Sequence, residues 1–212
     1  MGIKGNNNIL VAADKKEYSV VKRVPSKKIF NNIMNQDGIY DKDTLKTLYQ
    51  NILDGESYCY TLENINGNII GLSVINDIKG DTCRLEYIVL DRTTRGHGNG
   101  KRLLDSILSD FESTGQRIWF RVNDDPRFWK DKSVIIPFVP SWDKKPWYVY
   151  IIDKEKIEYN NIYLDQDSGC FKNVQESSVF SDMDTEKTQE YIRNLLKKDL
   201  GDIVKEYVIY PK

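Results

Sequence analysis

Three glycines at every second position, Gly96, Gly98 and Gly100, separate a run of apolar residues from a segment with helical periodicity. The run at residues 83–90 has the composition of a strand, and apolar side chains within residues 103–111 recur on one helical face. Alternate glycines let the backbone turn tightly and direct its N–H groups to one side, and the helix start adds partial positive charge there. The sequence therefore predicts a strand, an anion-binding loop and a helix, in that order.

Two common phosphate motifs do not fit this loop. The pattern G-x-x-x-x-G-K-[ST] would place a glycine at Arg95 and a serine or threonine at Arg102. The dinucleotide pattern G-x-G-x-x-G has its third glycine one residue later than Gly100, and it needs an acidic residue about 20 positions further on. The loop is instead bordered by Arg95, Lys101 and Arg102, which leaves the kind of phosphate open.

The rest of the chain also carries strand and helix signals. Alternating or continuous apolar runs predict strands at residues 18–24, 57–64, 69–78, 83–90, 118–122, 135–139 and 147–152. Apolar spacing predicts helices at residues 29–34, 43–53, 103–111 and 184–200. Turn signals join three of the strands into an antiparallel meander, and a helical crossover then leads to a parallel neighbour. We therefore expect an α/β fold with a mixed (α+β) sheet.

The chain divides into three parts by its sequence pattern. Residues 1–17 form a polar N-terminal segment, residues 18–152 hold the strands of the main domain, and residues 153–212 form an extension with a helix at about 184–200. The extension could cap the sheet, shape a groove for the substrate or make a homodimer contact, and the sequence leaves these alternatives open.

Composition and charge exclude several classes of function. The 212 residues include 31 basic and 32 acidic ones, a balance that predicts no nucleic-acid partner. No apolar run approaches the roughly 18 to 20 residues that a membrane helix needs, and the polar start predicts no secretory signal. Cys59, Cys83 and Cys170 lie far apart, which indicates free thiols and a cytoplasmic location. Because His97 is the only histidine, a two-histidine zinc site is impossible, and we expect no metal.

The pattern Arg95-x-x-Gly98-x-Gly100, after a strand and at the start of a helix, resembles motif A (Q/R-x-x-G-x-G/A) of the GNAT superfamily of N-acetyltransferases. The whole run at residues 85–100 keeps the spacing of that family, and its Leu85-Glu86 pair resembles the same place in spermidine/spermine acetyltransferases. The order of elements agrees over residues 18–152, and the resemblance ends at about residue 155.

The resemblance implies a binding site for acetyl-CoA. Its pyrophosphate would accept hydrogen bonds from the backbone of Arg95, Gly96, His97, Gly98, Asn99, Gly100 and Lys101. Its pantetheine arm would pair like an extra strand with Ile88, Val89 and Leu90, and the N–H near Leu90 would face the thioester oxygen. Asn123 matches a family asparagine on the pantetheine side.

The resemblance also implies a general base. An alkylammonium group with a pKa near 10.4 must lose its proton before it can attack, and at pH 7 this costs roughly 4.6 kcal/mol. Glu86, the one acidic residue of its strand, shares a face with Ile88 and Leu90 and could take that proton. The alternative for Glu86 is a solvent-facing position on a half-exposed sheet.

The general acid has no assignment from the sequence. Trp129 stands where many family members have a tyrosine, and an indole cannot supply a proton. Tyr148 or Tyr150 could substitute, or the CoA thiolate could leave unaided. We interpret His97 as a loop residue near the pyrophosphate rather than a proton-transfer group.

These features predict an acetyl-CoA-dependent N-acetyltransferase that transfers an acetyl group to a primary amine by direct attack on the thioester. The acceptor would be a polyamine-like small amine, or the lysine or N-terminal amine of a protein. The alternative is a catalytically weak or inactive module that binds CoA or acyl-CoA or acts as an interaction domain.

Overall fold

The computed structural model describes residues 9–10, 18–38, 40–121, 133–139, 147–152 and 162–173, and six separate residues between 186 and 197. The chain divides into two compact units. The first holds Met1–Ile78 and Arg84–Gly115, and the second holds Lys79–Cys83 and Gln116–Lys212. The domain boundaries expected from the sequence, at residues 17/18 and 152/153, stay predictions.

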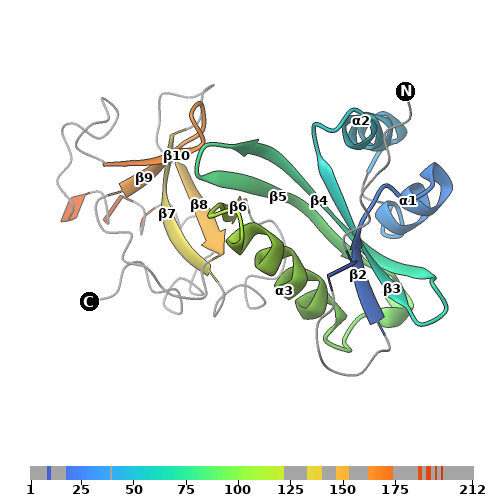
Figure 1. The fold of residues 1–212 in the computed structure, drawn as a ribbon. Coiled ribbons are helices and arrows are strands. Elements are labelled where there is room, and N and C mark those ends of the chain that lie inside the picture. Colours follow the sequence, from blue (N-terminus) through green and yellow to red (C-terminus); the bar gives the residue numbers. More distant parts are fainter. Residues whose placement is uncertain are drawn as a thin grey trace. The chain divides into compact units, whose positions relative to one another are not determined.

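The first unit contains strands flanked by helices (Figure 1). Its strands, in spatial order, are β1 (Ile9–Leu10), β2 (Tyr18–Lys22), β3 (Tyr58–Asn64), β4 (Ile69–Lys79) and β5 (Thr82–Leu90). Its helices are α1 (Lys27–Met34), α2 (Lys42–Leu53), the short 3₁₀ helix η1 (Arg92–Thr94) and α3 (Asn99–Glu112). The pairs β1–β2, β2–β3 and β3–β4 are antiparallel, and the order β3-β4-β5 confirms the predicted meander.

Side-chain caps set the starts of α1 and α2. The Ser26 hydroxyl accepts a hydrogen bond from the Ile29 N–H (3.4 Å). One carboxylate oxygen of Asp41 accepts from the N–H groups of Asp43 (2.9 Å) and Thr44 (2.8 Å). Both caps satisfy N–H groups that a helix start leaves without an intrahelical acceptor.

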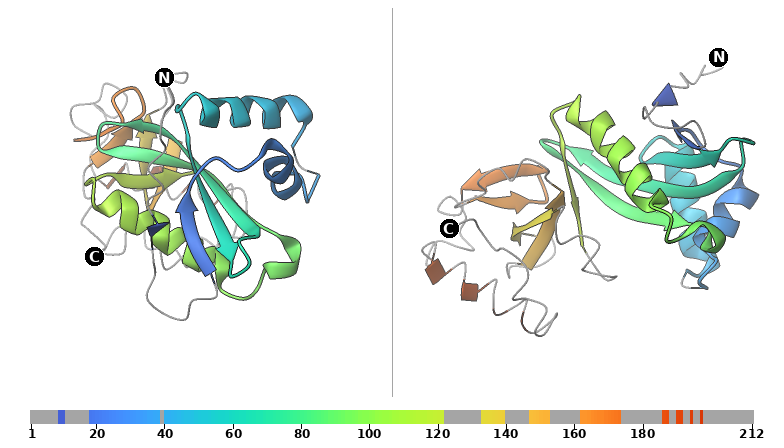
Figure 2. Two further views of the ribbon diagram at one scale, coloured as in Figure 1. Left: turned by 45° about the vertical axis from the view of Figure 1, so that its right-hand side comes forward. Right: turned by 90° about the horizontal axis from the view of Figure 1, so that it is seen from below.

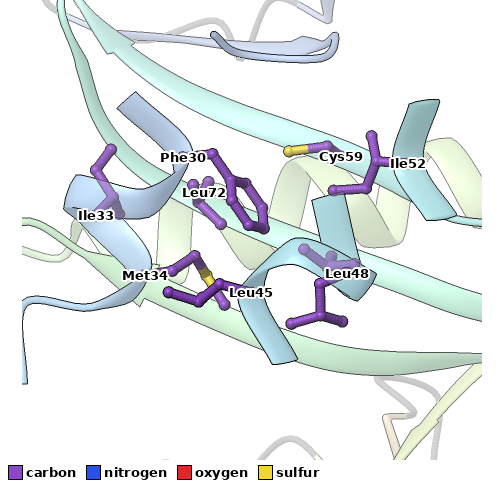
Figure 3. Close-up of a cluster of buried hydrophobic side chains, with 9 residues drawn as sticks. Phe30, Ile33, Met34, Leu45, Leu48, Ile52, Cys59 and Leu72 are labelled. Carbon is purple, nitrogen blue, oxygen red and sulfur yellow. The ribbon is translucent and has the colours of Figure 1, made fainter. Parts of the chain in front are cut away.

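A cluster of apolar side chains fills the space between α1, α2 and one face of the strands (Figure 3). Its members are Phe30, Ile33, Met34, Leu45, Leu48, Ile52, Cys59, Leu72 and Val74. Two half-buried side chains of β5, Tyr87 and Val89, pack against the cluster. Full burial of a large apolar side chain contributes about 1.5–3 kcal/mol, so this cluster firmly holds both helices on the strands.

Helix α3 covers the opposite face of the same strands, as Figure 2 shows. Neighbouring residues of β3 divide between the two faces. Cys59 joins the cluster beside α1 and α2, whereas the Tyr60 ring centroid lies 6.3 Å from that of Phe111 in α3. The Tyr60 hydroxyl also donates to the carboxylate of Asp110. The helical face predicted from the sequence is buried in the structure: Leu103, Leu104, Ile107, Leu108 and Phe111.

The second unit contains its own set of strands. Their spatial order is β6 (Arg117–Phe120), β8 (Trp147–Ile152), β7 (Ser133–Val139), β9 (Ile162–Asp165) and β10 (Cys170–Asn173). The β7–β9 pair is parallel and the other pairs are antiparallel. The Asp81 N–H and the Thr82 hydroxyl each donate to the Gly169 carbonyl (both 3.0 Å), so the turn between β9 and β10 holds the tip of the β4–β5 hairpin.

The predicted α/β class with a mixed sheet is confirmed. The β9–β10 hairpin was not predicted from the sequence. Of the helix expected at residues 184–200, six residues are described and are helical, and the rest lies outside the described residues. Within the described part of the chain, no helix is both long and apolar enough to cross a membrane.

Candidate functional site

The bend between β5 and α3 is fixed by its own polar side chains. The Asp91 carboxylate accepts from the Thr93 N–H (2.9 Å), which caps η1. The Thr94 hydroxyl lies within hydrogen-bond distance of the carbonyl oxygens of Asp91 (2.8 Å) and Ile70 (3.3 Å). The side-chain amide of Asn99, at the start of α3, donates to the Thr94 carbonyl (3.0 Å). Both ends of the bend are therefore joined to each other and to β4.

Two glycines of the bend have left-handed backbone conformations. Gly96 has φ +80° and Gly98 has φ +76°, values that L-residues with a side chain rarely adopt. No atom lies within 4 Å of the place where a Cβ would stand on either residue. The surface of the bend is therefore open at both glycines, and a ligand could approach the backbone closely.

The N–H groups that follow these glycines are available to a ligand. The first helical hydrogen bond of α3 runs from the Arg102 N–H to the Gly98 carbonyl (3.1 Å). Among the described residues, the backbone N–H groups of residues 96–101 have no hydrogen-bond acceptor. Unpaired N–H groups and the positive end of the helix dipole together favour an anion. Lys101 and Arg102 are exposed beside them and add positive charge.

The end of β5 runs directly into this bend. Because Tyr87 and Val89 pack toward α1 and α2, the alternate residues Ile88 and Leu90 are expected to face the side of α3. A Cβ on Gly100 of α3 would lie 3.6 Å from a Leu90 methyl group, which agrees with this orientation.

Gly71 on the neighbouring strand β4 lies close to the end of β5. A Cβ on Gly71 of β4 would lie 2.5 Å from a methyl group of Leu90 and 3.1 Å from the carbonyl oxygen of Val89. A side chain at residue 71 would therefore require the Leu90 side chain to move and the Val89 carbonyl to shift slightly.

The carboxylate of Glu86 is held by two neighbours. Its Oε1 accepts from Arg84 Nη2 (3.2 Å), and its Oε2 pairs with Arg84 Nε (2.9 Å) and accepts from Asn76 Nδ2 (3.1 Å). The Glu86 side chain is 16% exposed, so these contacts are only partly open to water. A two-point contact with a guanidinium fixes a carboxylate in position.

A pair of tyrosine rings lies close to Glu86. The ring of Tyr87 meets that of Tyr40, from the α1–α2 connection, edge to face with centroids 5.0 Å apart. Burial raises the pKa of Tyr87 above its ordinary value, and the adjacent negative charge of Glu86 adds to the rise. The Tyr87 hydroxyl is therefore protonated at neutral pH.

The other residues expected at the site lie in different parts of the chain. His97 is exposed between the two left-handed glycines, and Asn123 and Trp129 lie outside the described residues. Tyr148 and Tyr150, considered as general acids, belong to β8 of the second unit. Tyr150 is only 1% exposed and stacks on Phe120, with ring centroids 5.2 Å apart.

The sequence analysis missed four polar residues that hold the site. Arg84 could have been found, because a period of two places it on the same face as Glu86. Asn76 and Asp37 carry no local signal, since their partners lie on other elements. Arg92 forms an ion pair with Asp37, as Arg95 does. In the described part of the chain, no cluster of ligand side chains could hold a metal ion.

Comparison with known proteins assigns the central part of the chain to a family. Residues 27–130 match the model of the acetyltransferase (GNAT) family. This part of the chain therefore belongs to the GNAT family of acetyltransferases. The superfamily expected from the Arg95-x-x-Gly98-x-Gly100 pattern is confirmed. No curated protein sequence matches the chain.

Solved structures of acetyltransferases are similar to this chain. A GNAT-family acetyltransferase from Staphylococcus aureus Mu50 superposes with a TM-score of 0.51 at 16% identity, over 65% of this chain and 99% of that one. A mutant of the spermidine N-acetyltransferase SpeG from Vibrio cholerae superposes with a TM-score of 0.49 at 12% identity, over 65% and 93%. At such low identity the likeness to the S. aureus structure shows the fold alone.

Proposed function

We propose that the protein is an acetyl-CoA-dependent N-acetyltransferase that acts on a primary amine. The observation that carries this proposal is the row of unpaired N–H groups at residues 96–101, formed around Gly96 and Gly98 inside the segment that matches the family. Acetyl-CoA presents a diphosphate that such a row can bind, and it supplies an activated thioester for acyl transfer.

The bend and the end of β5 would each bind a different part of acetyl-CoA. The N–H groups of residues 96–101 would hold the diphosphate, with Lys101 beside them. The edge of Ile88, Val89 and Leu90 would pair with the pantetheine arm, and an N–H near Leu90 would donate to the thioester oxygen. Such a donor contributes about 10²–10³ in rate where it is aimed at the developing charge. Asn123 would complete the pantetheine side.

Glu86 would act as the general base. The acceptor amine has to lose a proton, and a carboxylate takes it either directly or through one water molecule. Its contacts with Arg84 and Asn76 support this role, because they hold the carboxylate in a fixed position on β5, four residues before Leu90. The acceptor would be a polyamine-like small amine or an amine of a protein, and the general acid has no assigned residue.

The test is an amine panel with acetyl-CoA, in which release of the CoA thiol is followed. The panel includes polyamines, lysine peptides and peptides with free N-termini. Glu86→Gln is expected to lower kcat at pH 7 by about 10²–10³, with the Kd for CoA unchanged, because only the proton acceptor is lost. The matched control is Glu56→Gln, an exposed carboxylate in the turn after α2, which should retain full activity. Full activity of Glu86→Gln at pH 7 would show that the base is another group.

One observation favours a second candidate function. Both oxygens of Glu86 are already engaged by Arg84 and Asn76, and a carboxylate so engaged could serve a structural role in a module that binds CoA without catalysis. The same experiment separates the two candidates. CoA binding by calorimetry, with no thiol release over the whole panel, would establish the binding module.

A further inference from the structure

One carboxylate from the α1–α2 connection joins two arginines of the β5–α3 bend. Asp37 Oδ1 pairs with Arg92 Nε and Nη2, both at 2.8 Å, and Asp37 Oδ2 pairs with Arg95 Nη2 at 2.8 Å. Asp37 precedes Arg92 by 55 positions and Arg95 by 58 positions in the chain. We call this group, Asp37 with Arg92 and Arg95, the Asp37 bridge.

Two further hydrogen bonds tie the Asp37 bridge to the backbone of the bend. The side chain of Gln36 accepts from the Arg92 N–H (2.8 Å), and Arg95 Nε donates to the Leu90 carbonyl (3.1 Å). The bridge therefore contacts Leu90, the last residue of β5, and it includes Arg95, which directly precedes Gly96. It joins the segment that leads directly into the N–H groups of residues 96–101.

The ion pairs of the Asp37 bridge persist at neutral pH. The hydrogen bond from Arg95 and then that from Arg92 hold the pKa of Asp37 below its usual value. The carboxylate is thus ionised throughout the neutral range and keeps both guanidinium groups. The Arg95 guanidinium, which the sequence suggested as a phosphate neighbour, is directed to Asp37 and to the Leu90 carbonyl instead.

We propose that Asp37 is a positioning residue for the anion site: through Arg92 and Arg95 it holds the β5–α3 bend in the arrangement that binds the diphosphate of CoA. Asp37 itself makes no contact with the ligand in this proposal. The inference rests on the proposed function, because it assumes that CoA binds at the bend.

Charge alone and positioning predict opposite effects of neutralising Asp37. A carboxylate near an anion site repels the anion, so its removal would tighten CoA binding if charge were its only role. If Asp37 positions the bend, its removal frees two arginines and the segment between them, and CoA must then order that segment at a cost in affinity. The sign of the change in Kd therefore separates the two explanations.

The experiment is calorimetric titration of the full chain with CoA, for the wild type, Asp37→Asn, Asp37→Glu and the control Asp43→Asn. Asp43 is an exposed carboxylate in the first turn of α2 and carries the same charge change. We expect Asp37→Asn to raise the Kd about three- to fivefold, the scale of the loss of partly exposed ion pairs. Asp37→Glu should restore part of the affinity, and Asp43→Asn should bind as the wild type does.

Two accompanying readouts distinguish positioning from a general loss of structure. The binding stoichiometry and the kcat at saturating acetyl-CoA should stay unchanged in Asp37→Asn, whereas a partly unfolded sample would lose stoichiometry at constant Kd. An unchanged or lower Kd in Asp37→Asn would overturn the inference. If the wild type itself fails to bind CoA, the proposed function fails first, and the outcome is distinct from a failure of the Asp37 bridge.

Discussion

Replacement of Gly98 by alanine perturbs the anion site without adding a steric clash. Gly98 has φ +76°, and no atom lies within 4 Å of its built Cβ, so the cost of Gly98→Ala is purely conformational. An L-residue in the left-handed region costs roughly 1–2 kcal/mol. If the bend relaxes to avoid this strain, CoA has to restore the original conformation and pay the same amount. This corresponds to a rise of about five- to thirtyfold in the Kd for CoA.

The matched control lies at the other end of the same helix. Gly115, after the C-terminus of α3, has φ +73° and equally open space around its built Cβ. Both variants should lose up to about 1–2 kcal/mol of unfolding free energy in urea. Only Gly98→Ala should lose CoA affinity in calorimetric titration. Wild-type affinity in Gly98→Ala, or an equal loss in Gly115→Ala, would refute the assignment of the bend as the anion site.

Two further predictions concern the packing of the chain. Burial raises the pKa of the Cys59 thiol to about 12, so a thiol reagent at pH 8 should modify half-buried Cys170 well before Cys59, and equal rates by peptide mapping would contradict the buried position. Gly169→Ala should lower the free energy of unfolding by more than about 2 kcal/mol, because its Cβ would collide with the carbonyl group of Lys79. Gly38→Ala, with the same φ of +66° in open space, should lose clearly less in the same urea titration.

The sequence predicted the first unit well because its signals are local. The Asn66-Gly67-Asn68 turn, the period of two in the strands and the period of 3.6 in α2 and α3 each depend on neighbours within a few residues. Helix α1 begins two residues before the predicted start at Ile29, since the capping role of Ser26 was overlooked. The β9–β10 hairpin was missed because two four-residue strands carry little alternation, although Gly169 marks its turn.

The polar framework of the site could not be predicted in the same way. The bridge from Asp37 to Arg92 and Arg95, and the contact from Asn76 to Glu86, join residues of different elements. No periodicity connects such partners, so they become visible only when the fold brings them together. The glycines of the bend were predictable, because their backbone conformation is a local property of residues without a side chain.

The assignment of the β5–α3 bend as the diphosphate site can be decided by titrating ¹⁵N-labelled protein with CoA and following the backbone amide resonances. We expect saturable shifts that are largest at Gly96, Gly98 and Gly100 and weaker along Ile88–Leu90, because the N–H groups of the bend would gain a charged acceptor. Inorganic pyrophosphate should shift the same glycines. Saturable CoA binding that leaves the three glycine resonances in place, with the main changes elsewhere in the chain, would contradict the assignment.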